Sequence, residues 1–189
     1  MEILYKNTKI NYICKNKGEN AIVFLHGWGG SIASFSSLSE QLDNFSTKHI
    51  LIDFPPFGKS EEPKEVWTLY DYVECIKMIL DAENVKKVIF VAHSFGGRVA
   101  ICFANLYTNK VQKMIITGGA GIKPKKSLKK SVRKIKYKII RFFNKKAKVG
   151  SKDYRNLSPV MKKTFSNIVN LSVILEKIAL LADTLFSSI

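Results

Sequence analysis

The residues best able to do chemistry in this 189-residue sequence lie around Ser94, in the stretch AHSFGG at 92–97. An apolar run over 88–92 precedes the serine, and apolar residues at helical spacing follow it at once. This order predicts a serine on a sharp turn between a strand and a helix, where its hydroxyl can attack a carbonyl carbon. The alternative is an ordinary turn whose serine caps the helix. A nucleophilic serine also needs a base, usually a histidine.

Two other stretches share the position of a loop after an apolar run: FLHGWGG at 24–30 and DFPPFGKS at 53–60. Glycines at 27, 29 and 30 allow the backbone of the first loop to approach a substrate closely. Asp53 opens the second loop, and we expect its carboxylate to stabilise that turn by side-chain hydrogen bonds.

Alternating apolar runs and helical patterns must position these loops. The expected strands cover 9–14, 21–25, 49–54, 87–92 and 113–119, with helices over 32–42, 66–85 and 96–108. The N-terminal stretch 1–13 is also expected to be a strand. Apolar strands separated by helices indicate a parallel sheet covered on both faces. Ligands bind beyond the carboxyl ends of such strands, where all three stretches fall.

Together, the three stretches resemble the α/β-hydrolase fold superfamily in its serine-nucleophile branch. The resemblance covers about residues 8–121. The family's nucleophile elbow is a Gly-x-Ser-x-Gly turn that carries the serine, and Ala92 replaces its first glycine here. Pro56 replaces a glycine that the family often has in the loop corresponding to DFPPFGKS. It implies an α/β fold with a mostly parallel sheet, helices on both faces and a helical cap. We therefore predict a hydrolase core over 1–121, a basic helical cap over 122–170 and an apolar helical tail over 171–189.

The resemblance also implies the roles of individual residues. Ser94 is the catalytic nucleophile, and the backbone N–H groups of Trp28 and Phe95 form the oxyanion hole. The residues expected to shape the surrounding loops are His26, Gly27, Gly29 and Gly96. The implied reaction is hydrolysis of a carboxylic ester, a lipid or a C–C bond through an acyl-enzyme, with a small-molecule ester or lipid-like substrate and no metal or organic cofactor. Serine at the elbow argues against the dehalogenase and epoxide-hydrolase branches, which use aspartate there.

The base that this family requires is missing from the expected place. The triad runs in chain order Ser, then Asp or Glu, then His, yet His26, His49 and His93 all precede Ser94. We expect His26 to hold its loop by hydrogen bonds, His93 to point to the other side of the sheet, and His49 to be solvated. Asp153 and Asp183 follow no recognisable strand and turn.

We therefore expect the C-terminal part that carries the triad Asp and His to be absent, which would leave this chain impaired or inactive. The alternative is a non-catalytic binding or membrane-surface protein that retains the fold. Without that C-terminal part, we expect the last strand of the core to be an exposed sheet edge through which the chain could self-associate. We expect the apolar stripe over 171–185 to pack near that edge.

The formal net charge of +16 comes from one segment, since thirteen Lys or Arg residues and no acidic residue lie between 123 and 148. Apolar residues at spacings of three and four make this segment an amphipathic basic helix or pair of helices. It is interpreted as a solvated cap helix or as a helix on an anionic membrane surface. No nucleic-acid-binding motif accompanies the charge, so nucleic acid is not the expected partner.

The remaining composition excludes several classes of protein. Three separated cysteines, Cys14, Cys75 and Cys102, argue against a disulfide framework or a zinc site and are expected to pack as small hydrophobic residues. No uninterrupted apolar stretch is long enough to predict a transmembrane helix. The N-terminus does not resemble a secretory signal, so the cytoplasm is the expected location.

Overall fold

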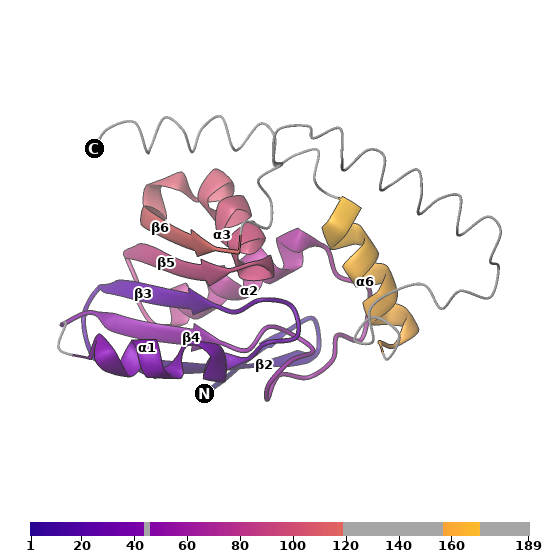
Figure 1. Ribbon diagram of the computed structural model, residues 1–189, viewed down its shortest axis with the longest axis horizontal. Helices are drawn as coiled ribbons and strands as arrows, with labels where there is room; N and C mark the ends of the chain where they lie inside the picture. The colour runs from indigo at the N-terminus through magenta and orange to yellow at the C-terminus, as the bar shows by residue number, and fades with distance from the viewer. Residues whose placement is uncertain (44–45, 119–156, 171–189) are drawn as a thin grey trace.

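The computed structural model describes residues 1–43, 46–118 and 157–170 and contains a six-stranded sheet flanked by helices (Figure 1). The basic segment 123–148 and the apolar tail 171–189 lie outside the described residues, as does most of the predicted cap. The boundaries between the three predicted domains therefore stay predictions.

The strands are β1 (Glu2–Tyr5), β2 (Thr8–Lys15), β3 (Asn20–Leu25), β4 (Lys48–Ile52), β5 (Lys87–His93) and β6 (Val111–Thr117). The α-helices are α1 (Ser36–Gln41), α2 (Leu69–Ala82), α3 (Phe95–Leu106) and α6 (Pro159–Asn170). The two short 3-10 helices are η1 (Ile32–Ser34) and η2 (Thr108–Lys110).

The sheet is mixed but mostly parallel, in the order β1-β2-β4-β3-β5-β6. Strands β4, β3, β5 and β6 run parallel, and β1 and β2 are antiparallel to their neighbours. The predicted α/β class is confirmed. The single N-terminal strand predicted over 1–13 was wrong, because the chain reverses at Lys6 and Asn7, whose φ angles of 47° and 55° form a tight hairpin turn.

Helices cover the sheet on both sides. On one face, Phe35 and Leu42, the residues that flank α1, pack against the cluster of Phe24 and Leu51. Helices α2 and α3 cover the larger core on the other face, behind the sheet in Figure 1. The helix predicted over 32–42 is divided at Phe35 into η1 and α1.

Strand β6 forms one edge of the sheet within the described part of the chain, and its Ile115 side chain is 56% exposed. Self-association through this edge remains a prediction. No helix in the described ranges is long and apolar enough to cross a bilayer.

Candidate active site

Ser94 lies on the turn between β5 and α3, at the carboxyl edge of the sheet. Its φ of 50° and ψ of −109° lie in a region that residues other than glycine rarely adopt. Its backbone N–H donates to the Thr117 carbonyl at 2.9 Å, which ties the turn to the end of β6. Strain of this kind costs about 1–3 kcal/mol and persists where the surrounding fold holds it in place.

Two glycines allow the backbone to pack this tightly around the serine. A Cβ atom on Gly96 would lie 2.2 Å from the carbonyl oxygen of Leu25, so the start of α3 could not rest against β3 with any larger residue. A Cβ atom on Gly27 would lie 2.9 Å from His93 Cδ2 and 3.4 Å from Ser94 Cβ. The loop after β3 therefore presses directly against the serine turn.

The backbone N–H groups of Trp28 and Phe95 lie on these two neighbouring segments. Neither N–H donates a hydrogen bond to another residue in the described part of the chain, whereas Gly30 N donates to Gly27 O and Gly97 N donates to Ser94 O. Gly29, with φ of 83°, turns the loop away after Trp28. Two unused donors beside a strained serine are what an oxyanion hole requires.

His26 is fully engaged in holding the loop. Its Nε2 accepts a hydrogen bond from the Phe54 backbone N–H at 2.8 Å, so Nδ1 carries the proton and donates to Gly27 O at 2.7 Å. Burial lowers the pKa of His26, against smaller opposing effects from the Gly27 bond and Asp53. A neutral imidazole with both nitrogens occupied cannot also serve as the base for Ser94.

His49 does not match its prediction. We expected it to be solvated, but its side chain is buried, with Nδ1 3.1 Å from Ser39 Oγ and its ring 5.6 Å from that of Phe24. Strand β4 is an interior strand and α1 covers its start, which the sequence pattern of β4 alone does not reveal. Burial lowers the pKa of His49.

His93 is exposed at the carboxyl edge of the sheet, with Nδ1 3.1 Å from Thr117 Oγ1. Its ring lies between Gly27 and Gly118, since Cβ atoms at those positions would contact it. Across the ranges that the structure describes, no histidine side chain hydrogen-bonds the hydroxyl of Ser94.

Ser94 lines a cavity of about 170 Å³. Its lining residues are Trp28, Ser94, Phe95, Arg98, Phe165, Ile168 and Val169. The last three come from α6, which follows far later in the sequence and falls within the range predicted as the cap.

The contacts that hold α6 over the cavity include three between described residues. The Trp67 backbone N–H donates to Thr164 Oγ1 at 3.0 Å, and the Trp28 and Phe165 rings meet at 4.9 Å. The third contact is the hydrogen bond of Arg98 Nη1 to the carbonyl of Ile168, 3.1 Å long. The sequence analysis singled out neither Arg98 nor Phe165. A signal for Arg98 existed, because it lies four residues after Ser94, in the first turn of the helix that follows the serine.

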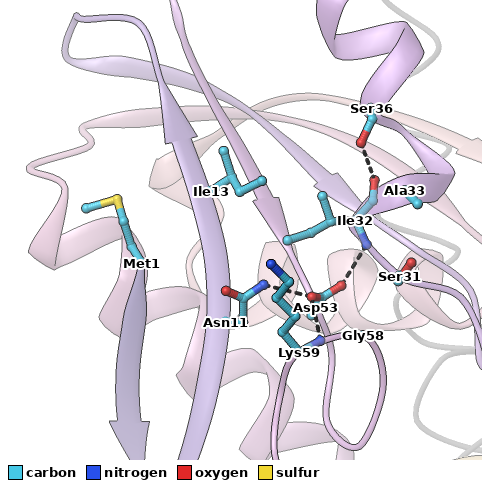
Figure 2. A pocket seen from close by; sticks show the side chains of 10 residues that line it. All are labelled: Met1, Asn11, Ile13, Ser31, Ile32, Ala33, Ser36, Asp53, Gly58 and Lys59. Carbon is cyan, nitrogen blue, oxygen red and sulfur yellow. Dashed lines mark hydrogen bonds between the residues drawn. The ribbon is translucent and has the colours of Figure 1, made fainter.

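A larger cavity, about 410 Å³, lies beside Asp53 and not beside Ser94 (Figure 2). The Asp53 carboxylate is buried there and accepts three hydrogen bonds, from the backbone N–H groups of Ile32 and Lys59 and from Asn11 Nδ2, at 2.7 to 2.9 Å. The expected role of Asp53 in stabilising its turn is confirmed.

Neither metal nor thiol chemistry has a site among the residues described. No cluster of three His, Cys, Asp or Glu side chains there could hold a metal ion. Cys75 and Cys102 are buried, and burial raises the pKa of both thiols, that of Cys102 to about 11. Both pack in the main core, as the sequence predicted, and Cys14 packs against it.

Comparison with known proteins identifies a common fold. Residues 20–153 match the family described as alpha/beta hydrolase fold. A Caenorhabditis elegans relative, "Abhydrolase domain-containing protein abhd-5.2", is 32% identical over 128 residues, which cover 61% of this chain and 29% of that protein. A Paraburkholderia phymatum "2-hydroxy-6-oxononadienedioate/2-hydroxy-6-oxononatrienedioate hydrolase" is 28% identical over 59% of this chain and 40% of its own length.

Solved structures give the same result. A meta-cleavage product hydrolase from Pseudomonas fluorescens is 28% identical, with a TM-score of 0.57 over 66% of this chain and 47% of that one. An α/β hydrolase from a deep-sea metagenome, at 20% identity and a TM-score of 0.59, shares the fold over 94% of this chain. The matched region thus spans well under two thirds of the curated relatives' own length.

Proposed function

The chain belongs to the α/β-hydrolase fold family, and from that premise we propose that it contains the nucleophile and oxyanion hole of a serine hydrolase that cleaves carboxylic esters or C–C bonds. One observation carries the proposal. Ser94 is strained on its turn, lines a cavity, and lies beside the unused N–H groups of Trp28 and Phe95.

The proposed reaction follows from this geometry. Ser94 Oγ bonds to the substrate carbonyl carbon while its proton passes to a base, and the N–H groups of Trp28 and Phe95 stabilise the resulting oxyanion. Collapse breaks the C–O or C–C bond, the leaving group takes up a proton, and water then hydrolyses the acyl-enzyme. A single oxyanion-hole donor contributes about 3 kcal/mol to such a step.

The relatives support a small-molecule substrate. The bacterial relatives at 25–28% identity are hydrolases of 2-hydroxy-6-oxononadienedioate, and the Pseudomonas fluorescens protein is a meta-cleavage product hydrolase. The apolar cavity walls of Trp28, Phe165 and Ile168 suit the acyl part of a substrate of that size.

We also propose that the 189-residue chain by itself reacts slowly. His26 is committed to Phe54 and Gly27, His49 is buried away from the site, and His93 contacts Thr117. Without a base the hydroxyl of Ser94 is a weak nucleophile. Binding and an oxyanion hole alone still retain about 10³ to 10⁴-fold acceleration over water.

Labelling with a fluorophosphonate, read by intact mass, tests both statements. We expect slow addition of one probe molecule to the wild-type chain and no addition to Ser94→Ala. The matched control Ser36→Ala should be labelled at the same slow rate as the wild-type chain. Added imidazole should accelerate the Ser94-dependent labelling, because it supplies the base from solution.

Two results would contradict the proposal. Fast labelling without imidazole would show that a base already serves Ser94. No labelling of a folded chain, even with imidazole, would show that Ser94 is not a nucleophile and would favour a binding protein that retains only the fold.

A further inference from the structure

Arg98 is a charged residue in the wall of an otherwise mostly apolar cavity. It lies in the first turn of α3, is half-buried, and lines the same cavity as Ser94. Its neighbours in that wall include Trp28, Phe165 and Ile168. A guanidinium in such surroundings has lost part of its hydration and needs other partners.

The described structure gives it only one. Nη1 donates to the carbonyl oxygen of Ile168, and no carboxylate in the described ranges forms an ion pair with Arg98. A guanidinium carries five N–H donors, so most of those of Arg98 have no acceptor among the described residues. Burial lowers the pKa of Arg98.

The contact with Ile168 has a structural purpose of its own. Ile168 is near the end of α6, where the last carbonyls have no partner within the helix and carry a partial negative charge. A neutral donor could also satisfy that carbonyl, although more weakly than a cation does. Arg98 also lines the cavity beside Ser94, where its positive charge is not needed to satisfy the end of α6.

We propose that Arg98 binds a carboxylate on the acyl part of the substrate, so that the site selects acids whose apolar body rests on Trp28 and Phe165. The inference rests on the proposed function for the identity of the bound molecule, but not on any reaction. A carboxylate matches the planar guanidinium and forms charge-assisted hydrogen bonds about twice as strong as neutral ones. An uncharged acyl group of the same shape would leave the cation unpaired.

The test compares two ligands that differ only in charge, 3-phenylpropanoate and 3-phenylpropanamide, by calorimetric titration of the full chain at fixed ionic strength. We expect the acid to bind about 10-fold more tightly, as one charge-assisted contact contributes. The Trp28 indole resonance should shift with both ligands, because its ring lines the cavity. Neither ligand is an ester, so the binding comparison remains valid even if the fluorophosphonate does not label Ser94.

Three variants assign the preference to Arg98. Arg98→Gln keeps a donor for Ile168 but removes the charge, and it should bind acid and amide equally. Arg98→Lys should retain part of the preference. The matched control Lys163→Gln removes one positive charge from an exposed position of α6 and should leave the preference unchanged.

Several outcomes would overturn the proposal. Equal binding of acid and amide by the wild-type chain would do so, as would binding of neither. If Arg98→Gln weakened both ligands equally and altered the Trp28 resonance of the free protein, Arg98 would only hold α6 in place. A loss of preference in Lys163→Gln would assign the effect to the general positive field of the protein.

Discussion

The ends of two strands in the same sheet, β4 at Asp53 and β5 at Ser94, are built on opposite principles. At Asp53 a buried carboxylate accepts hydrogen bonds from three donors. At Ser94 the backbone is strained, two N–H groups have no acceptor among the described residues, and the Arg98 cation has no anion. The first arrangement stabilises the fold, and the second leaves groups available for a ligand.

Cavity size alone would favour the end at Asp53 over the proposed site at Ser94. The cavity beside Asp53 is about 410 Å³, against about 170 Å³ beside Ser94. The proposal for Ser94 rests on its strained turn and on the N–H groups of Trp28 and Phe95, which have no acceptor among the described residues, and not on cavity volume. His26 links the end of β4 to the loop after β3, since it accepts a hydrogen bond from the Phe54 N–H and donates one to Gly27 O.

The largest expected effect comes from removing the satisfied carboxylate. Asp53→Ala leaves three donors without their acceptor, two of them on the backbone of Ile32 and Lys59. We expect the free energy of unfolding, measured in urea, to fall by about 3 kcal/mol. The exposed Asp43→Ala serves as a control and should change it by less than about 0.5 kcal/mol. Equal effects of the two substitutions would break the comparison.

The next effect concerns the histidines and pH. The folded pKa values of His26 and His49 are lowered by burial, so the unfolded chain takes up protons first as the pH falls. Their contribution to stability is complete above the unfolded value of about 6.5 and is lost below it. Between pH 7.5 and 5.5 we expect a loss of about 1 kcal/mol for each histidine.

Urea unfolding at the two pH values measures this loss. His26→Gln and His49→Gln should each remove about half of the pH dependence, whereas their stabilities at pH 7.5 need not match. The Trp28 resonance should respond in the first variant alone, because only His26 holds that loop. A flat pH profile in the wild-type chain would contradict the burial of both rings.

The smallest effect is a gain of stability at the reactive end. Ser94→Gly relieves the strain of a φ of 50°, which a glycine adopts freely, although glycine also loses more entropy on folding. We expect a net stabilisation of about 1 kcal/mol with loss of labelling. Ser94→Ala, which keeps the strain, should be close to neutral. A destabilised glycine variant would mean that Ser94 has a structural role like that of Asp53.

Much of the core was predictable because its signals are local. The apolar runs of β3, β4 and β5 and the loops that follow them identify the sheet and its reactive edge within a few residues. Helix α2 was predicted too long, since its start is fixed by the Thr68 N–H bond to the Asp71 carboxylate at 2.6 Å. The burial of His49 was missed because it depends on which strands flank β4.

The sequence by itself determined the strand-to-helix turn at Ser94, the glycines that permit it and the order of the loops along the chain. These features depend on steric limits within a few residues, which any copy of the same segment would meet. Only the tertiary structure decided that α6 lies over Ser94, that Arg98 lacks an anionic partner in the described ranges, and that both nitrogens of His26 are occupied. Those properties depend on contacts between residues far apart in the chain, and hydrogen-bond partners at such separations leave no periodic trace in the sequence.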